Sequence, residues 1–135
     1  MLRGSCLCAG VRYEISGSLN GALNCHCVMC RKAQGAAFRS RARVRAEDFR
    51  FVAGEELMSY YASSPGNWRG FCRICGSSLF SRFDHDLAGY GLALGSLDDD
   101  PGIAPALHVF VAHKAPWFKI TDTLTQYQEL PPTRS

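Results

Sequence analysis

The chain has 135 residues, of which 47% are hydrophobic and 20% charged, so it suits one folded domain and excludes a disordered chain. Its formal charge of +3 is too small to predict a nucleic-acid-binding surface. It contains no apolar run of about 18 residues that would predict a membrane span, and its N-terminus does not resemble a signal peptide. We therefore expect a single cytoplasmic domain over residues 1–135, with a loose tail at 132–135.

Short apolar or alternating runs separated by turn residues indicate a mainly β chain. From the N-terminus, strands are expected at residues 11–16, 38–46, 57–62, 78–83, 90–97 and 106–112. Two helical pieces are expected, one from Val28 to about Gly35 and one short turn at 46–49. The 13 glycines and 6 prolines are spread along the chain, which fits an all-β domain with many turns.

Four of the seven cysteines form two short pairs that are typical of a metal site. Cys6 and Cys8 lie two positions apart, so in an extended segment both sulfurs point to the same side. Cys72 and Cys75 form C-x-x-C, and Gly76 accommodates the tight turn that lets both thiolates bind one ion. Together the two pairs predict a closed, tetrahedral zinc site of structural type, whereas disulfides are not expected.

The other three cysteines lie in CHCVMC, residues 25–30. Cys25 and Cys27 share one side of an extended segment, and a helical turn after Cys27 brings Cys30 onto that side. Three protein ligands with one open position are typical of a catalytic zinc. His26 points to the opposite side, so we expect it to support the ligands or face the substrate, with core packing as the alternative. The candidate catalytic residues are thus Cys25, Cys27, Cys30 and His26.

The residues alone leave another partition of the ligands open. One cysteine of CHCVMC could join the C-x-x-C pair, and Cys6 and Cys8 would then be left without a metal. Spacing along the chain does not decide between the two partitions.

Five segments carry a resemblance to a known family, in the expected order: GSCLCAGVRYE, NCHCVMCRKAQGAAF, FCRICGSSLF, GSLDDDPGIAPALHVFV and KAPWFKITDTLTQY. Over about residues 4–132 the chain resembles the glutathione-dependent formaldehyde-activating enzymes. The resemblance implies a β-tent fold, in which several short antiparallel sheets are held by a structural zinc. It implies two zinc ions per chain, the structural one on Cys6, Cys8, Cys72 and Cys75 and the second on Cys25, Cys27 and Cys30.

The implied activity is that of a carbon–sulfur lyase that joins formaldehyde to glutathione and gives S-hydroxymethylglutathione. A zinc with an open position can bind the glutathione thiol and lower its pKa. Three thiolates weaken the Lewis acidity of the ion, so delivery of the thiol is favoured over polarisation of the aldehyde. The carboxylates of glutathione, as co-substrate, call for cationic anchors, and the candidates are Arg31, Lys32 and Lys114. The expected partners are a small thiol and an aldehyde, and a homodimer is an open alternative.

The segment AAFRSRARVRAEDF departs from the resemblance. Small, aromatic or apolar residues are expected at the four positions taken here by Arg39, Arg41, Arg43 and Arg45. Alternation along a strand places all four on one face. At least two are expected to be solvated only, while the others would form an anion-binding wall; a nucleic-acid strip is less favoured. This leaves two alternatives to the lyase: a non-enzymatic zinc domain that contacts a protein or nucleic acid through this face, and an enzyme on another small thiol or aldehyde.

The remaining candidates have simpler interpretations. His108 lies in an apolar strand and is expected to be hydrogen-bonded in the core, and His85 is expected in a turn. His113 is interpreted either as a proton shuttle near the zinc or as an exposed residue, because histidine titrates near neutral pH. Trp117 and Phe118 are expected to pack a loop onto the core.

Overall fold

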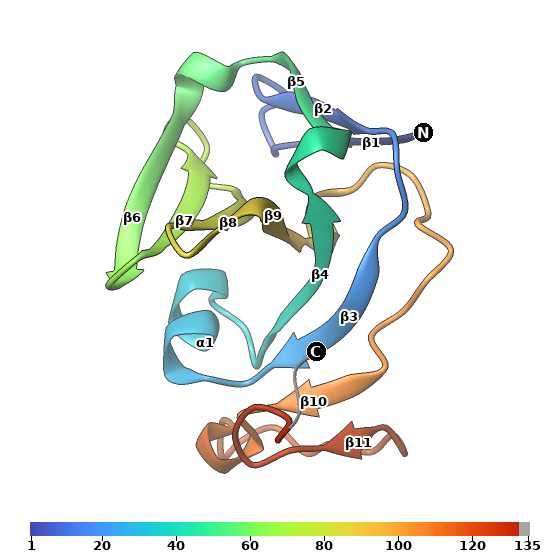
Figure 1. Ribbon diagram of the computed structural model, residues 1–135. Coiled ribbons are helices and arrows are strands. Elements are labelled where there is room, and N and C mark those ends of the chain that lie inside the picture. The colour runs from blue at the N-terminus through green and yellow to red at the C-terminus, as the bar shows by residue number, and fades with distance from the viewer. Residues whose placement is uncertain (133–135) are drawn as a thin grey trace.

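The computed structural model of the protein describes residues 1–132, so the last part of the tail expected to be loose, 133–135, lies outside the described residues. Within residues 1–132 the strands form a three-stranded sheet, β1-β2-β5, and an eight-stranded sheet, β11-β10-β3-β4-β9-β8-β7-β6. The strands are β1 (Leu2–Ser5), β2 (Arg12–Ile15), β3 (Asn20–Cys25), β4 (Arg39–Arg45), β5 (Phe49–Ala53), β6 (Met58–Ser64), β7 (Asn67–Cys72), β8 (Ser78–Phe83), β9 (Asp86–Ala93), β10 (Leu107–Val109) and β11 (Thr125–Gln126). Figure 1 shows the larger sheet curving around the helix α1 (Val28–Gln34).

Helix α1 follows from its local sequence. Cys27 is the N-cap: its backbone is extended, and its Sγ accepts a hydrogen bond from the backbone N–H of Cys30 at 3.3 Å. Gly35 ends the helix in the left-handed conformation, with φ 60°, which glycine adopts without steric cost. The predicted helix is therefore confirmed, and the predicted turn at 46–49 is the 3-10 turn η1 (Ala46–Asp48).

The predicted all-β class is confirmed, and two predicted strands end earlier than expected. β9 stops at Ala93, where the 3-10 turn η3 (Leu94–Ser96) begins. β10 stops at Val109, because Phe110 has φ 57° and turns the chain into the 3-10 turn η4 (Val111–His113). Most strand pairs are antiparallel as expected, but β10 pairs parallel with both β3 and β11.

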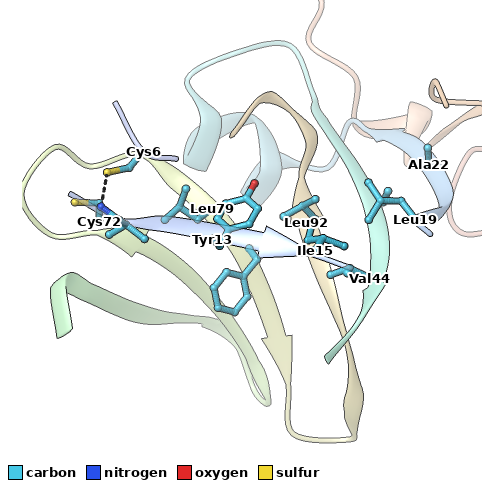
Figure 2. Close-up of a cluster of buried hydrophobic side chains, with 12 residues drawn as sticks. Cys6, Tyr13, Ile15, Leu19, Ala22, Val44, Cys72, Leu79 and Leu92 are labelled. Carbon is cyan, nitrogen blue, oxygen red and sulfur yellow. Dashed lines mark hydrogen bonds between the residues drawn. The ribbon is translucent and has the colours of Figure 1, made fainter. Parts of the chain in front are cut away.

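The core lies between the two sheets. Tyr13 and Ile15 of β2 point toward Leu79 and Leu92 of the larger sheet, and Val44 lies beside them (Figure 2). These side chains are essentially inaccessible to solvent. Burial of each such side chain contributes about 1.5–3 kcal/mol relative to exposure, so this cluster holds the sheets together.

The opposite face of the larger sheet carries polar and charged residues. Arg39 of β4 pairs directly with Cys25 of β3, Ser81 pairs with Gly91, and Arg69 pairs with Ser81. Residues directly opposite in a sheet share one face, so these side chains lie on the face that curves around α1. This face positions the sites described below.

Within residues 1–132, no helix combines the length and the apolar character needed to cross a membrane. The remaining 3-10 turn is η2 (Glu55–Leu57), which connects β5 to β6.

Candidate metal centres

Two separate groups of cysteine thiols lie in the structure, and each could hold a metal ion. The first group consists of Cys6, Cys8, Cys72 and Cys75, whose Sγ atoms all lie within 4.8 Å of one another. The Sγ of Cys8 is 3.6 Å from that of Cys6 and 3.9 Å from that of Cys72. A tetrahedral zinc with Zn–S bonds of about 2.3 Å requires neighbouring sulfurs about 3.8 Å apart, so the four thiols fit a closed zinc site.

Backbone and side-chain hydrogen bonds fix the first group. The N–H of Val11 donates to Cys6 Sγ at 3.3 Å, and the N–H of Gly76 donates to the carbonyl of Cys72 at 2.7 Å, which closes the C-x-x-C turn. Hydrogen bonds from the Ser77 hydroxyl and backbone lower the pKa of Cys75 to about 5, so this thiol favours the thiolate that binds metal. The site therefore joins the end of β1 to the turn between β7 and β8.

The second group consists of Cys25, Cys27 and Cys30, again with Sγ atoms within 4.8 Å of one another. Cys25 ends β3, Cys27 caps α1, and Cys30 lies in the first turn of the helix. Among residues 1–132, no fourth histidine, cysteine or carboxylate joins the group. The three sulfurs suit a thiophilic ion such as zinc, and a metal bound by them would keep one position open.

An arginine that the sequence gave no reason to select contacts this second group. The Nη2 of Arg69, on β7, donates to Cys30 Sγ at 3.5 Å. The pKa of Cys30 is lowered to about 2, because the thiols of Cys25 and Cys27 donate hydrogen bonds to it and Arg69 adds a further donor and a positive charge. The pair is 39 residues apart in sequence, so only the folded sheet brings them together.

Arg39 lies beside the second group and is 5% exposed. Its Nη1 donates to Ser81 Oγ at 2.8 Å, and its Nη2 donates to the carbonyl of Gly91 at 2.9 Å. Burial lowers the pKa of Arg39 to about 10, while the charges of Cys30 and Cys25 oppose this shift. Within the described residues no carboxylate forms an ion pair with Arg39, and the nearby Cys30 thiolate supplies the main opposing charge.

His26 lies between the cysteines of the second group and is fully buried. As predicted, its side chain does not join the three sulfurs, and its burial favours a supporting role over contact with substrate. Its Nε2 lies 2.8 Å from Nδ1 of His108, whose Nε2 lies 3.0 Å from Oδ2 of Asp122. Burial lowers the pKa of His26 to about 4, with the charge of His108 as a further cause, so the ring is neutral at neutral pH. The predicted hydrogen-bonded core position of His108 is confirmed.

Comparison with known proteins places the chain in a family. The family model described as "Glutathione-dependent formaldehyde-activating enzyme" matches residues 1–113. The chain belongs to this family. A Halomonas elongata protein, provisionally named a glutathione-dependent formaldehyde-activating enzyme, is 29% identical over 130 residues, which cover 89% of this chain and 81% of that protein. The crystal structure of a Rhodobacter sphaeroides protein matches with a TM-score of 0.62 and 29% identity, over 76% of this chain and 97% of that one.

The arginines at which this family member departs from the expected pattern have different surroundings. Arg43 forms an ion pair with Asp86, and Arg45 pairs with Asp48 at 3.0 Å. Both arginines are exposed, which confirms the expectation of a solvated face for two of the four. Arg41 is half-buried, and Arg39 is buried as described above, so the four do not form one continuous basic strip.

The predicted anchors for glutathione in this family member differ in their accessibility. Lys32 is exposed and Arg31 is half-buried, and both lie in the last turn of α1. Lys114 is less suitable than predicted, because its Nζ donates to the carbonyl of Phe118 at 2.5 Å and to that of Ala115 at 3.2 Å. Its ammonium group is therefore used to close the loop that follows η4.

Aromatic and histidine side chains near this loop only partly match the predictions. Phe118 is half-buried and packs against Phe38 with ring centroids 5.5 Å apart, as expected. Trp117 is 71% exposed, so its predicted packing is wrong: the turn at Pro116 directs it to solvent. His113 is exposed beside Glu129, and His85 lies in the predicted turn between β8 and β9.

One cavity has a volume of about 680 Å³. It lies between the first cysteine group and the C-terminal end of α1, where Cys6, Gln34, Phe38 and Arg39 line it. The cysteines of the second group do not line this cavity. Phe38 and Arg39 nevertheless bring its wall next to them, because Phe38 packs on the His26 ring and Arg39 pairs with Cys25.

Proposed function

We propose that this family member is a zinc-dependent carbon–sulfur lyase that forms or cleaves an S-hydroxymethylglutathione-like adduct at Cys25, Cys27 and Cys30. The observation that carries the proposal is the difference between the two cysteine groups. The first offers four thiols and would be closed around its ion, whereas the second offers three and would leave a position for a substrate sulfur. Family membership supports glutathione and formaldehyde as the substrates.

In the proposed reaction the thiol sulfur of glutathione forms a bond to the carbon of formaldehyde. The carbonyl π bond breaks, and the proton lost by the thiol ends on the former carbonyl oxygen, so the product is a thiohemiacetal and no redox partner is required. When bound at this site, zinc supplies coordination of the substrate thiol and so favours its thiolate. Cleavage of the adduct is the same sequence reversed.

The residues of the chain have separate proposed roles. Cys25, Cys27 and Cys30 hold the metal, and three thiolates with one zinc ion sum to a net charge of −1. Arg69 and Arg39 offset this charge, because Arg69 donates to Cys30 and Arg39 lies buried beside Cys25. The arrangement allows an incoming substrate thiolate to bind without adding uncompensated negative charge to a partly buried site.

We propose that Arg31 and Lys32 bind a carboxylate of glutathione, since both follow Cys30 directly and lie on the same helix. The ammonium group of Lys114 already donates to two carbonyls, which assigns it to the scaffold. The seven cysteines are grouped as candidate metal ligands, which suits the reducing cytoplasm proposed as the location of the protein.

One alternative has support of its own, namely an enzyme acting on another small thiol or aldehyde. Four arginines stand at positions where small, aromatic or apolar residues are expected, and Arg39 lies next to the second cysteine group and lines the cavity of about 680 Å³. The non-enzymatic alternative loses support, because Arg43 and Arg45 are paired with carboxylates and offer little free charge to a protein or nucleic acid.

The test is zinc content per chain together with calorimetric binding of glutathione to the zinc-loaded protein. Glutathione should bind to the wild type, whereas S-methylglutathione, which lacks the free thiol but keeps both carboxylates, should bind much more weakly. Cys27→Ser should hold about one zinc fewer and lose the preference for the free thiol. Equal binding of the two peptides, or unchanged binding by Cys27→Ser, would remove the second cysteine group from the reaction. Turnover is then followed by exchange spectroscopy, because formaldehyde and glutathione also condense without an enzyme.

A further inference from the structure

A chain of three hydrogen-bonded side chains starts next to the second cysteine group and ends at the surface. His26 and His108 are 0% and 1% exposed, and their rings meet through Nε2 and Nδ1 at 2.8 Å. His108 Nε2 then meets the carboxylate of Asp122 at 3.0 Å and 3.2 Å. The two histidines are 82 residues apart in sequence, so the chain exists only in the folded protein.

The carboxylate fixes the direction of every hydrogen bond in the chain. An ionised carboxylate can only accept, so Nε2 of His108 carries the proton that it donates to Asp122. In its neutral form a ring that carries the proton at Nε2 has a lone pair at Nδ1, and this lone pair accepts from Nε2–H of His26. The tautomer of His26 is therefore set by His108, and the tautomer of His108 is set by Asp122.

His26 is also the point at which the loop of the second cysteine group is attached to the sheet. Its backbone N–H donates to the carbonyl of Val109 at 3.0 Å, and Val109 pairs with Cys25 in the parallel β3–β10 ladder. The ring of Phe38 packs against its imidazole at 5.0 Å. Because Cys25 and Cys27 flank His26, a shift of the His26 backbone would move both sulfurs, and a ring locked by its hydrogen bond and packing resists such a shift.

We propose that His108 and Asp122 are positioning residues for the second zinc: they hold His26 in one tautomer and one rotamer, and thereby hold Cys25 and Cys27 in place as ligands. Neither residue contacts the first cysteine group, and no hydrogen bond within residues 1–132 links that group to His108. The effect is therefore confined to the second zinc. The proposal rests on the proposed second zinc site and adds the residues that set its affinity.

The experiment compares variants of Asp122 by stepwise removal of zinc with a chromogenic chelator. Asp122→Leu removes the acceptor, whereas Asp122→Asn keeps an oxygen at Oδ1, the atom that also accepts from the N–H of Leu124 at 3.0 Å. Outer partners of metal sites typically change affinity by about 10–100-fold, so Asp122→Leu should release the second zinc at roughly tenfold or more lower chelator concentration. Asp122→Asn should lie close to wild type, and the first zinc should be unchanged in both.

Asp99→Leu is the matched control. Like Asp122, Asp99 accepts hydrogen bonds from a backbone N–H and from a side chain, and both donors belong to Arg3 rather than to a histidine. It should leave both zinc affinities at the wild-type value.

A second pair of variants tests His26, at the other end of the hydrogen-bonded series. His26→Gln keeps a donor near the position of Nε2 and should retain the second zinc better than His26→Leu, which has none. With cobalt in place of zinc, the absorption bands of the second site should change in Asp122→Leu and His26→Leu only.

Three results would overturn the inference. These are release of the second zinc at the wild-type chelator concentration in both leucine variants, equal weakening of both zinc sites, and an asparagine variant as weak as the leucine variant. The outcomes also distinguish failure of this inference from failure of the proposed lyase function. A wild type with one zinc would overturn both, whereas two zincs with an Asp122 effect but no preference for the free thiol of glutathione would overturn the lyase proposal alone.

Discussion

Arg69 Nη2 lies 3.5 Å from Cys30 Sγ, and this contact connects strand β7 to the helix that carries the second cysteine group. A cation that donates to a metal-binding thiolate stabilises the charged form of that sulfur. The contact gives the eight-stranded sheet a direct part in the site, beyond supporting the loop of residues 25–30.

Arg69→Met keeps the aliphatic part of the side chain and removes the donor. A hydrogen bond to a charged group contributes about 1.5–3 kcal/mol, and at this long distance the lower value applies, which corresponds to roughly tenfold. The second zinc should therefore be released at about tenfold lower chelator concentration than in wild type. Arg82→Met on the neighbouring strand β8 is the control, because Arg82 lies over the ring of Tyr60 and, within residues 1–132, donates no hydrogen bond to a cysteine. Equal zinc release in the two variants would contradict the role of Arg69.

Cys72→Ser and Cys27→Ser should differ in kind. A structural zinc contributes about 10–16 kcal/mol of folding free energy in small zinc domains, which is as large as the whole stability of a typical domain. Cys72→Ser should consequently yield unfolded or insoluble protein, while Cys27→Ser should yield folded protein with one zinc fewer. Circular dichroism and zinc analysis of the soluble fractions check this. Identical behaviour of the two variants would show that the division into structural and reactive sites is wrong.

Arg39→Met and Arg43→Met test two arginines of the same strand. Arg39 is buried and donates to Ser81 and Gly91, so its loss leaves a buried hydroxyl and a carbonyl without their donor, at a cost of about 1–3 kcal/mol. Arg43 is exposed and pairs only with Asp86, and exposed ion pairs contribute little. Urea unfolding of the zinc-loaded proteins should give a clearly lower midpoint for Arg39→Met and a nearly unchanged one for Arg43→Met. The reverse order would mean that Arg39 is not an integral part of the fold.

The pairing of Arg45 with Asp48 predicts a pH dependence. The side-chain hydrogen bond from Arg45 holds the pKa of Asp48 below its usual value. A carboxyl whose pKa is lowered by folding adds stability above its unfolded pKa of about 3.9, and this contribution is lost as the pH falls through the lower folded value. Asp48→Asn should thus have a lower urea midpoint than wild type at pH 7, and the difference should shrink below about pH 4. A difference that stays constant down to pH 3 would contradict the assignment.

The sequence by itself determined the local geometry of the cysteines. C-x-C and C-x-x-C fix which sulfurs share a side, and Cys27 and Gly35 delimit α1 through capping and a left-handed residue. These features depend on residues within one turn or one strand of each other, so spacing is enough to predict them. The overall β class followed in the same way from short alternating runs, although five strands, β1, β3, β5, β7 and β11, were not predicted.

Only the tertiary structure decided what surrounds the second cysteine group. Alternation placed Arg39 and Arg43 on one face, yet one is buried and the other exposed, because burial depends on which strands and which helix cover each position. His108 and Arg69 reach His26 and Cys30 across 82 and 39 residues of sequence. Contacts of this kind arise from strand order and register, which are set by packing of the whole sheet and leave no trace in local spacing.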